Sequence, residues 1–324
     1  MALRIGILGA AKIAPGAVIK PTADNPDFVV SAVGARDPQR AQAYAAEHGI
    51  PHVAKDYGAL VRHPEVDVVY NALPPSGHAK WSIAALEAGK HVLCEKPFAM
   101  NAAQVRPMMD AARRTGRTLV EAFHNRHHVV MKRAVQIVRS GELGRLVRAE
   151  ATFGAPIPYR EGELRWTREQ GGGALMDLGT YPVMALRTVL GGEPRVMRAK
   201  CTMDHGVDVT TVADLDFGGV PAALSTSMVP ERFGANLTVE GANGKMEIMN
   251  YLAPQMGCRF TVTIGGQSRD EPTQGDATYV AQLKELGDVL LRGKTPLVTL
   301  EDSLGNMTAI DAIYAAGGVD RHFA

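Results

Sequence analysis

The stretch that decides the fold is Arg-Ile-Gly-Ile-Leu-Gly-Ala-Ala-Lys-Ile-Ala at residues 4–14. A short apolar run leads into a turn of small residues, and helical character follows the turn, which is typical of a buried strand joined tightly to a helix. Small residues there let backbone N–H groups at the helix N-terminus face a pyrophosphate, whose negative charge the helix dipole favours. The segment therefore predicts a dinucleotide-binding site.

The spacing of this turn departs from the usual Gly-x-Gly-x-x-Gly/Ala pattern, since it reads Gly9-x-Ala11-x-x-Ala14. Taken alone the motif is weak, because Gly6 and Gly9 could simply end a strand. Its context strengthens it, since further apolar strands alternate with helical stretches and imply a parallel, doubly wound sheet. These strands are expected at Val29–Ala35, Val66–Leu73 and His91–Cys94.

The end of the second strand normally selects the cofactor, because an acid there binds the ribose 2′-hydroxyl whereas a nearby arginine accommodates a 2′-phosphate. Here that end reads Gly34-Ala35-Arg36-Asp37-Pro38. Asp37 stands directly before a proline that suits a first helical turn, so it is expected to cap the next helix. Arg36 then remains to meet a phosphate, which favours NADP(H) and leaves NAD(H) possible. The alternative is an ordinary surface arginine.

The composition indicates an enzyme of two domains that acts on a small molecule. The 324 residues suit about two domains, and 46% hydrophobic residues can fill their cores. A formal net charge of +1 gives no electrostatic footprint for nucleic acid or an anionic membrane. The sequence shows no membrane-spanning apolar run and no signal peptide, and its three cysteines lie far apart, so the cytoplasm is the expected compartment.

Past about residue 122 the pattern changes to long β-type runs, several of which alternate apolar and polar residues. The chain is thus divided into a nucleotide-binding domain at 1–122 and an α+β domain at 123–324. One face of the sheet in the second domain is left free, which suggests a homodimer or homotetramer. The largely antiparallel sheet is expected from residues 146–156, 194–203, 208–217, 220–229, 234–240 and 245–250, with helices at 127–140, 276–292 and 302–316.

Several segments together resemble the Gfo/Idh/MocA oxidoreductases over essentially the whole chain. The resemblance implies an N-terminal Rossmann domain and a C-terminal α+β domain on a large, mostly antiparallel sheet. Tyr181 stands where inositol dehydrogenases commonly carry histidine, so the chain looks most like the dihydrodiol dehydrogenases and the NADP-dependent aldose (xylose-type) dehydrogenases. Departures from the pattern are Ala11 and Val129, which replace a glycine and a proline. The segments are Ala72-Leu73-Pro74 with His78, Glu95-Lys96-Pro97 with Asn101, Glu121-Ala122-Phe123 with Arg126, and Gly171–Tyr181 with Asp177.

The resemblance also implies which residues bind ligands. His78 could instead cap the helix that contains Trp81, and Trp166 could serve packing alone. The histidines at 124, 127 and 128 invite a metal site, but no acidic ligand, cysteine pair or HExxH sequence completes one, so no metal is expected. The implied cofactor set is Gly9, Ala11, Lys12, Ile13, Arg36, Leu73, Pro74, His78, Glu95 and Lys96, and the implied substrate set is Arg126, His127, Trp166 and Asp177.

The chemistry of alcohol oxidation assigns roles to three residues. Removing a hydride from a carbinol carbon requires the hydroxyl proton to leave, and Tyr181 can take it if a positive charge lowers a phenol pKa that is ordinarily about 10. Lys96 can supply that charge, and in reduction it stabilises the negative charge that builds on the carbonyl oxygen. Asp177 lies four residues before Tyr181, on the same helix face, and is expected to bind substrate and align Lys96. Each residue has a structural alternative: a strand-end lysine, a capping acid and a core aromatic.

The expected function is NADP(H)-preferring hydride transfer between nicotinamide and a CH–OH or carbonyl group of a polyhydroxylated substrate, a sugar or a cyclic diol. Two alternatives remain open. One is an enzyme that retains its nucleotide and uses transient oxidation to cleave a glycosidic bond. The other is a non-catalytic nucleotide sensor, for which the presence of Lys96, Asp177 and Tyr181 together would be a coincidence.

Overall fold

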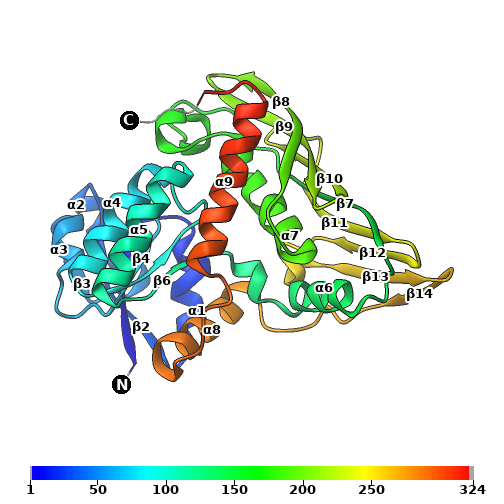
Figure 1. Cartoon of the computed structure of the whole chain (residues 1–324). Helices are drawn as coiled ribbons and strands as arrows, with labels where there is room; N and C mark the ends of the chain where they lie inside the picture. Colours follow the sequence, from blue (N-terminus) through cyan, green and yellow to red (C-terminus); the bar gives the residue numbers. More distant parts are fainter. Residues whose placement is uncertain (1, 321–324) are drawn as a thin grey trace. The chain divides into compact units, whose positions relative to one another are not determined.

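The computed structural model describes residues 2–320, which form two compact units (Figure 1). The first unit holds the residues up to His124 together with Tyr279–Leu304, and the second holds Asn125–Thr278 together with the described residues from Gly305 onward. The expected division at residue 122 placed α8 (Thr278–Arg292) in the second domain, whereas in the structure nearly all of α8 belongs to the first unit. An ion pair joins this helix to the rest of the first unit, because Arg292 Nη2 donates to Asp27 Oδ2 at 2.6 Å.

The first unit contains the predicted doubly wound parallel sheet. Its six strands lie in the order β3-β2-β1-β4-β5-β6, so the strand order reverses at β1, and ligands of such sheets bind beyond the carboxyl ends of the strands at this reversal. Figure 1 shows helices alongside these strands. The short strands β3 and β6 were not expected, because three residues are too few to show a period. The bounds are β1 (Leu3–Leu8), β2 (Phe28–Gly34), β3 (His52–Ala54), β4 (Val68–Asn71), β5 (His91–Cys94), β6 (Leu119–Glu121), α1 (Lys20–Ala23), α2 (Pro38–His48), α3 (Tyr57–Val61), α4 (Pro75–Glu87) and α5 (Ala102–Thr115).

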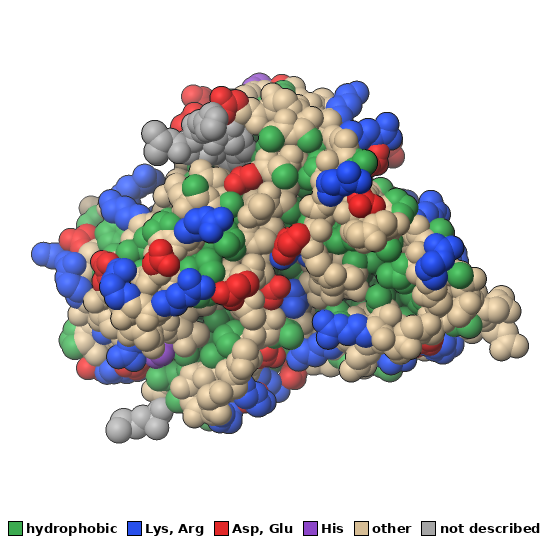
Figure 2. Space-filling view, in the orientation of Figure 1, with side chains coloured by type: hydrophobic (Ala, Val, Ile, Leu, Met, Phe, Trp, Pro, Cys, Tyr) green, Lys and Arg blue, Asp and Glu red, His purple; other side chains and the backbone are tan. Residues whose placement is uncertain are grey.

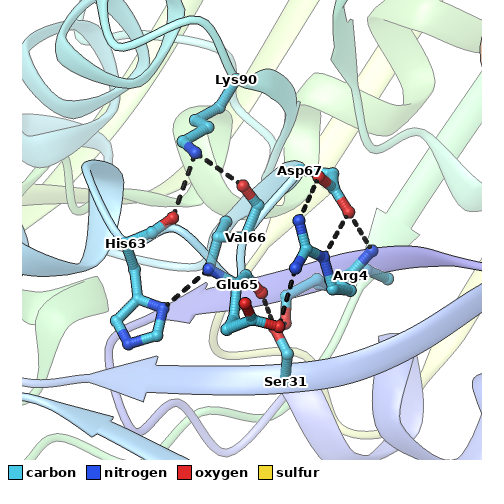
Figure 3. A network of polar contacts seen from close by, with 8 residues as sticks. Arg4, Ser31, His63, Glu65, Val66, Asp67 and Lys90 are labelled. Atoms are coloured by element: carbon cyan, nitrogen blue, oxygen red, sulfur yellow. Dashed lines mark hydrogen bonds and ion pairs between the residues drawn. The ribbon is translucent and has the colours of Figure 1, made fainter.

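A polar network ties together the amino ends of the strands in this sheet (Figure 3). Arg4 of β1 donates to both carboxylate oxygens of Asp67, at 2.8 and 2.9 Å, and to Glu65 at 2.7 Å. Lys90, directly before β5, donates to the Val66 carbonyl at 2.7 Å. The Arg4 guanidinium holds the pKa of Asp67 below its ordinary value. Because the strands are parallel, this network lies at the edge opposite to their carboxyl ends, and its role is structural.

The second unit is built on an eight-stranded, mostly antiparallel sheet, as predicted. Its order is β14-β13-β12-β11-β7-β10-β9-β8, and only β7 and β10 pair in parallel. Helix α7 packs against β7 and β10. The hairpin of β13 and β14 was not expected. The bounds are β7 (Leu146–Gly154), β8 (Arg195–Asp204), β9 (Val207–Phe217), β10 (Val220–Ser227), β11 (Gly234–Gly241), β12 (Gly244–Met249), β13 (Arg259–Ile264), β14 (Gln267–Asp270), α6 (Val129–Ser140) and α7 (Thr180–Leu190), with α9 (Leu300–Ala316) near the end of the chain.

Charged side chains of both signs are interspersed over the visible surface (Figure 2), in line with a formal net charge of +1. The face shown therefore has no broad area of one charge sign that would favour a polyanionic partner. In a separate respect, no helix within residues 2–320 is long and apolar enough to cross a membrane.

A buried carboxylate fastens α6 to the end of β14. Glu271 is 8% exposed and accepts hydrogen bonds from Arg133 of α6 at 2.7 and 3.2 Å and from Arg269 at 2.8 Å. The Arg133 hydrogen bonds, followed by those of Arg269, hold the pKa of Glu271 below its ordinary value of 4.5. A carboxyl group with a depressed pKa contributes stability that is fully present above its unfolded-state pKa and is lost as the pH falls through its folded-state pKa.

Glu271→Gln is therefore expected to lower the free energy of unfolding at pH 7 by about 1–2 kcal/mol, since the charge-assisted hydrogen bonds become ordinary ones. Denaturant unfolding of both proteins at pH 7, and then stepwise below pH 4.5, measures the difference. It should shrink toward the acid end because Glu271 becomes protonated there. A difference that stays constant over this range would contradict the role of the ionised carboxylate.

Candidate functional site

The predicted phosphate turn follows β1 and depends on one glycine. Gly9 has φ +89°, and its N–H donates to the Gly34 carbonyl at 2.7 Å. A Cβ added here would lie 3.2 Å from Leu73 Cδ2, so both the conformation and the space favour glycine. Ala11 is half-buried, and Lys12 and Ile13 after it are exposed. The turn thus presents backbone and small side chains at an accessible edge, which fits a diphosphate.

Side chains of α2 brace this turn. Arg40 Nη2 donates to the Ala10 carbonyl at 2.8 Å, and the Tyr44 hydroxyl donates to the Ala11 carbonyl at 3.1 Å. Sequence reasoning missed both, although Arg40 stands one helical turn after Arg36. Asp37 caps α2 as predicted, because its Oδ1 accepts from the backbone N–H groups of Gln39 and Arg40 at 2.9 and 3.4 Å. Arg36 is exposed beside this cap.

His78 joins the loop after β4 to the segment after β5. Its side chain is buried, with Nε2 2.7 Å from the carbonyl oxygen of Leu73 and Nδ1 2.8 Å from that of Pro97. Burial lowers the pKa of His78 to about 4. It does not cap α4, because the residue before that helix is Pro74. The ring links the backbone at Leu73 to the backbone at Pro97, the residue after Lys96. Its direct contact with nucleotide remains a prediction.

Lys96 and Glu95 follow β5 directly. Glu95 is 8% exposed and accepts from the Tyr70 hydroxyl at 2.6 Å and from the backbone N–H of Lys96 at 3.2 Å. Lys96 is half-buried, and the Lys96–Pro97 peptide is cis. The carboxylate of Glu95 thus holds the backbone of the lysine at the carboxyl edge of the sheet, the edge where the predicted cofactor residues lie.

Asp177 is held by an arginine that sequence reasoning did not assign. Its side chain is 12% exposed, and Oδ2 accepts from Arg165 Nε at 2.7 Å. Arg165 is itself oriented by Glu163, which accepts from Nη1 at 2.8 Å. The pKa of Arg165 is raised, first by the charge of Asp177. Asp177 is therefore bound as a carboxylate in a fixed orientation, while its edge reaches solvent.

Tyr181 lies in the first turn of α7 and is 4% exposed. Its ring meets that of Phe153 edge to face, with centroids 5.8 Å apart. The tyrosine is thus positioned by packing on β7, four residues beyond Asp177 in one continuous helical segment that begins with the π-helical turn Leu175–Gly179.

The other predicted substrate residues lie in the same unit. Arg126 Nη1 donates to the Thr188 hydroxyl of α7 at 2.6 Å, and His127 is buried. Trp166 is 7% exposed and meets Tyr159 edge to face, with centroids 5.4 Å apart. Their contacts with substrate stay predictions.

The site residues fall into two sets. The predicted cofactor residues and Lys96 lie in the first unit, and Asp177, Tyr181, Arg126, His127 and Trp166 lie in the second. Within the described part of the chain, no group of three His, Cys, Asp or Glu side chains is placed to hold a metal ion.

The chain resembles known oxidoreductases along most of its length. Residues 3–123 match the oxidoreductase family with an NAD-binding Rossmann fold, and residues 131–247 match the GFO/IDH/MocA C-terminal domain. The chain is 33% identical over 317 residues to D-xylose 1-dehydrogenase (NADP(+)) 2 of Haloferax volcanii, with 96% of both chains covered. It is 33% identical over 253 residues to trans-1,2-dihydrobenzene-1,2-diol dehydrogenase of Macaca fascicularis, covering 77% of this chain and 75% of the relative.

A solved structure has the same fold over nearly the whole chain. The crystal structure of aldose-aldose oxidoreductase from Caulobacter crescentus complexed with glycerol superimposes with a TM-score of 0.90 at 28% identity, covering 98% of both chains.

Proposed function

Because the chain belongs to the Gfo/Idh/MocA oxidoreductase family of NAD(P)-dependent dehydrogenases, we propose that it oxidises a CH–OH group of a sugar or a cyclic diol, or reduces the matching carbonyl. The observation that carries the proposal is the set of Lys96, Asp177 and Tyr181, each fixed by neighbours within its own unit. The names of the similar D-xylose and dihydrodiol dehydrogenases support the substrate class.

The first unit supplies the residues that would hold NAD(P). The backbone of the turn at Gly9 and Ala11 suits the diphosphate, with Lys12 and Ile13 beside it, while Leu73, Pro74, His78 and Glu95 shape the carboxyl edge of β4 and β5. When bound, the nicotinamide exchanges hydride with the substrate carbon. The exposed turn and the glycine conformation it requires support this fit.

Three side chains would then manage charge and proton. Lys96 Nζ donates a hydrogen bond to the substrate oxygen and stabilises negative charge on it. As a phenolate, Tyr181 Oη receives the hydroxyl proton during oxidation, and as a phenol it returns the proton during reduction. The Asp177 carboxylate, oriented by Arg165, accepts a hydrogen bond from a substrate hydroxyl. Arg126, His127 and Trp166 are proposed to bind the rest of the substrate.

Absorbance measurements of NADP⁺ and NAD⁺ reduction over a panel of aldoses, inositols and cyclic trans-diols test this proposal. Reduction that depends on one class of substrate would establish a dehydrogenase for that class. If nucleotide binds but no substrate is oxidised and none of the matching carbonyl compounds is reduced, dehydrogenation of this class is excluded. Tightly held nucleotide together with glycoside cleavage would then identify the enzyme that cleaves a glycosidic bond without net redox. Nucleotide binding without any reaction would identify the non-catalytic sensor.

We further propose that NADP(H) is preferred, because Arg36 is exposed at the end of β2 while Asp37 is engaged as a helix cap. Arg36→Ala should weaken NADP(H) binding by about 1–3 kcal/mol more than NAD(H) binding, since a charge-assisted phosphate contact is lost. Calorimetry with both nucleotides measures this difference. Arg106 is an exposed arginine of α5. Arg106→Ala is the control, and it should change neither the NADP(H) nor the NAD(H) affinity. Equal weakening of both nucleotides by the Arg36 variant would exclude a phosphate contact.

A homodimer or homotetramer through the large sheet is also proposed. The outward face of β7, β10 and β11 carries short, half-buried polar side chains, among them Thr152, Ser225 and Thr238. The ion pair of Arg148 and Glu240 lies on the same face. Sedimentation should find a dimer or tetramer that Thr238→Arg dissociates. A wild-type protein that sediments only as a monomer would contradict the proposal.

A further inference from the structure

The helical segment that carries Asp177 and Tyr181 begins without a local cap. Leu175 opens the segment, and Ala174 before it has no side-chain hydrogen-bonding group. The first N–H groups of a helix have no partner within the helix, and an anionic acceptor there is favoured by the helix dipole. The acceptor comes from β9 instead: Asp208 Oδ2 accepts from the Leu175 N–H at 2.8 Å.

Asp208 is itself fixed by two further donors. The Thr211 hydroxyl donates to Oδ2 at 2.8 Å, and the Tyr314 hydroxyl of α9 donates to Oδ1 at 2.7 Å. The residue is 3% exposed. A carboxylate this buried is costly unless donors surround it, and these three satisfy that requirement. The carboxylate thus connects β9, α9 and the start of the segment that carries Asp177.

The two glycines before the segment, Gly172 and Gly173, lie where a Cβ atom would not fit. Gly173 has φ +117°, and a Cβ added to it would overlap Asp208 Oδ1. A Cβ on Gly172 would lie 2.6 Å from the carbonyl oxygen of Arg165. The turn therefore packs between the loop that holds Arg165 and the carboxylate of Asp208. The turn is joined to the helical segment by a hydrogen bond from the Asp177 N–H to the Gly173 carbonyl at 3.0 Å.

We infer that Asp208 is a positioning residue for the reaction: it sets the start of the helical segment and thereby the places of Asp177 and Tyr181. The inference rests on the proposed function for its kinetic test. A misplacement of catalytic groups by about 1 Å can cost about 100-fold in rate, so loss of this anchor is expected to act on kcat rather than on nucleotide binding in the first unit.

Three variants and one control test the inference. Asp208→Ala should lower kcat by about 10- to 100-fold and leave the dissociation constant for NADP⁺ unchanged. Asp208→Asn should restore most of the activity, because its amide oxygen can accept from Leu175 and Thr211 while its NH₂ group donates to the Tyr314 oxygen. Tyr314→Phe removes one donor only and should give a smaller loss, which preserves the test if Asp208→Ala does not fold. Glu271→Ala removes an equally hydrogen-bonded buried carboxylate of the same unit and should keep the wild-type kcat.

Hydrogen exchange of the peptide at residues 174–181 separates this inference from the proposed function, since it needs no turnover. Asp208→Ala should speed exchange in this peptide about 10-fold, while Glu271→Ala should leave it unchanged. If the wild-type protein turns over no sugar or diol, the proposed function fails and exchange alone decides on Asp208. Unchanged exchange in Asp208→Ala, or equal effects of both alanine variants on exchange and kcat, would overturn the positioning role.

Discussion

Lys96→Met is expected to lower kcat by about 100- to 1,000-fold while the dissociation constant for NADP⁺ stays close to that of the wild type. Methionine keeps the unbranched shape of the side chain up to Cε and removes the ammonium group that would stabilise negative charge on the substrate oxygen. The neighbouring backbone is held by Glu95 and by the contact between His78 and the Pro97 carbonyl, so the turn should survive the change.

Single-turnover kinetics and calorimetry of the Lys96 variant measure the two quantities separately. Lys90→Met is the matched control, because Lys90 lies at the amino edge of the same sheet and donates to the Val66 carbonyl. This control should retain the wild-type kcat even if its melting temperature falls. A Lys96→Met enzyme with unchanged kcat would remove this lysine from the mechanism, and a large loss of NADP⁺ affinity would make it a binding residue instead.

Tyr181→Phe is expected to lower kcat by about 100- to 10,000-fold, because the proton acceptor is lost while the ring remains. The edge-to-face contact with Phe153 does not involve the hydroxyl, so α7 should stay in place. The pH dependence of the residual activity should also change, since the ionisation of the essential phenol disappears from the profile.

Tyr251→Phe provides the control for this experiment. Tyr251 is a fully buried tyrosine of the same unit, and its hydroxyl has no hydrogen-bond partner among the described residues. Burial raises the pKa of its phenol, so it stays protonated through the working range. Removing this hydroxyl should alter neither kcat nor the pH profile. Tyr181→Phe with wild-type kcat and an unchanged profile would contradict the assignment of Tyr181 as proton acceptor.

The sequence predicted the features whose causes are local. The apolar run and the turn of small residues predicted β1 and its connection, because both signals lie in neighbouring residues, and the structure adds that Gly9 has a positive φ. The cap at Asp37 was predicted from its place before Pro38, and the hydrogen bond from the Gln39 N–H to Asp37 Oδ1 confirms it. In the second unit, β-type runs, several of which alternate apolar and polar residues, predicted six of the strands to within two residues at each end.

Features that depend on distant partners were not predicted. Arg165 pairs with an acid 12 residues away across a loop, and Asp208 reaches back 33 residues to Leu175, separations at which no periodic pattern links the residues. Helix α8 carries no local signal for the first unit, since its partner Asp27 stands 265 residues earlier.

The missed hairpin has two causes. Strand β14 is polar and exposed along its length, so it lacks the alternation that marks a half-buried strand. Strand β13 does alternate, with Phe260 and Val262 buried, and this is the signal that would have revealed it.

In the proposed reaction, hydride passes directly between a CH–OH carbon of the substrate and the nicotinamide. Mass spectrometry of the reduced nucleotide, formed from a sugar or diol deuterated at the reacting carbon, measures this transfer. Each NADPH released should carry one deuterium, and Lys96→Met and Tyr181→Phe should slow the appearance of this label. Reduced nucleotide without deuterium, or cleaved glycoside with no reduced nucleotide released, would contradict it.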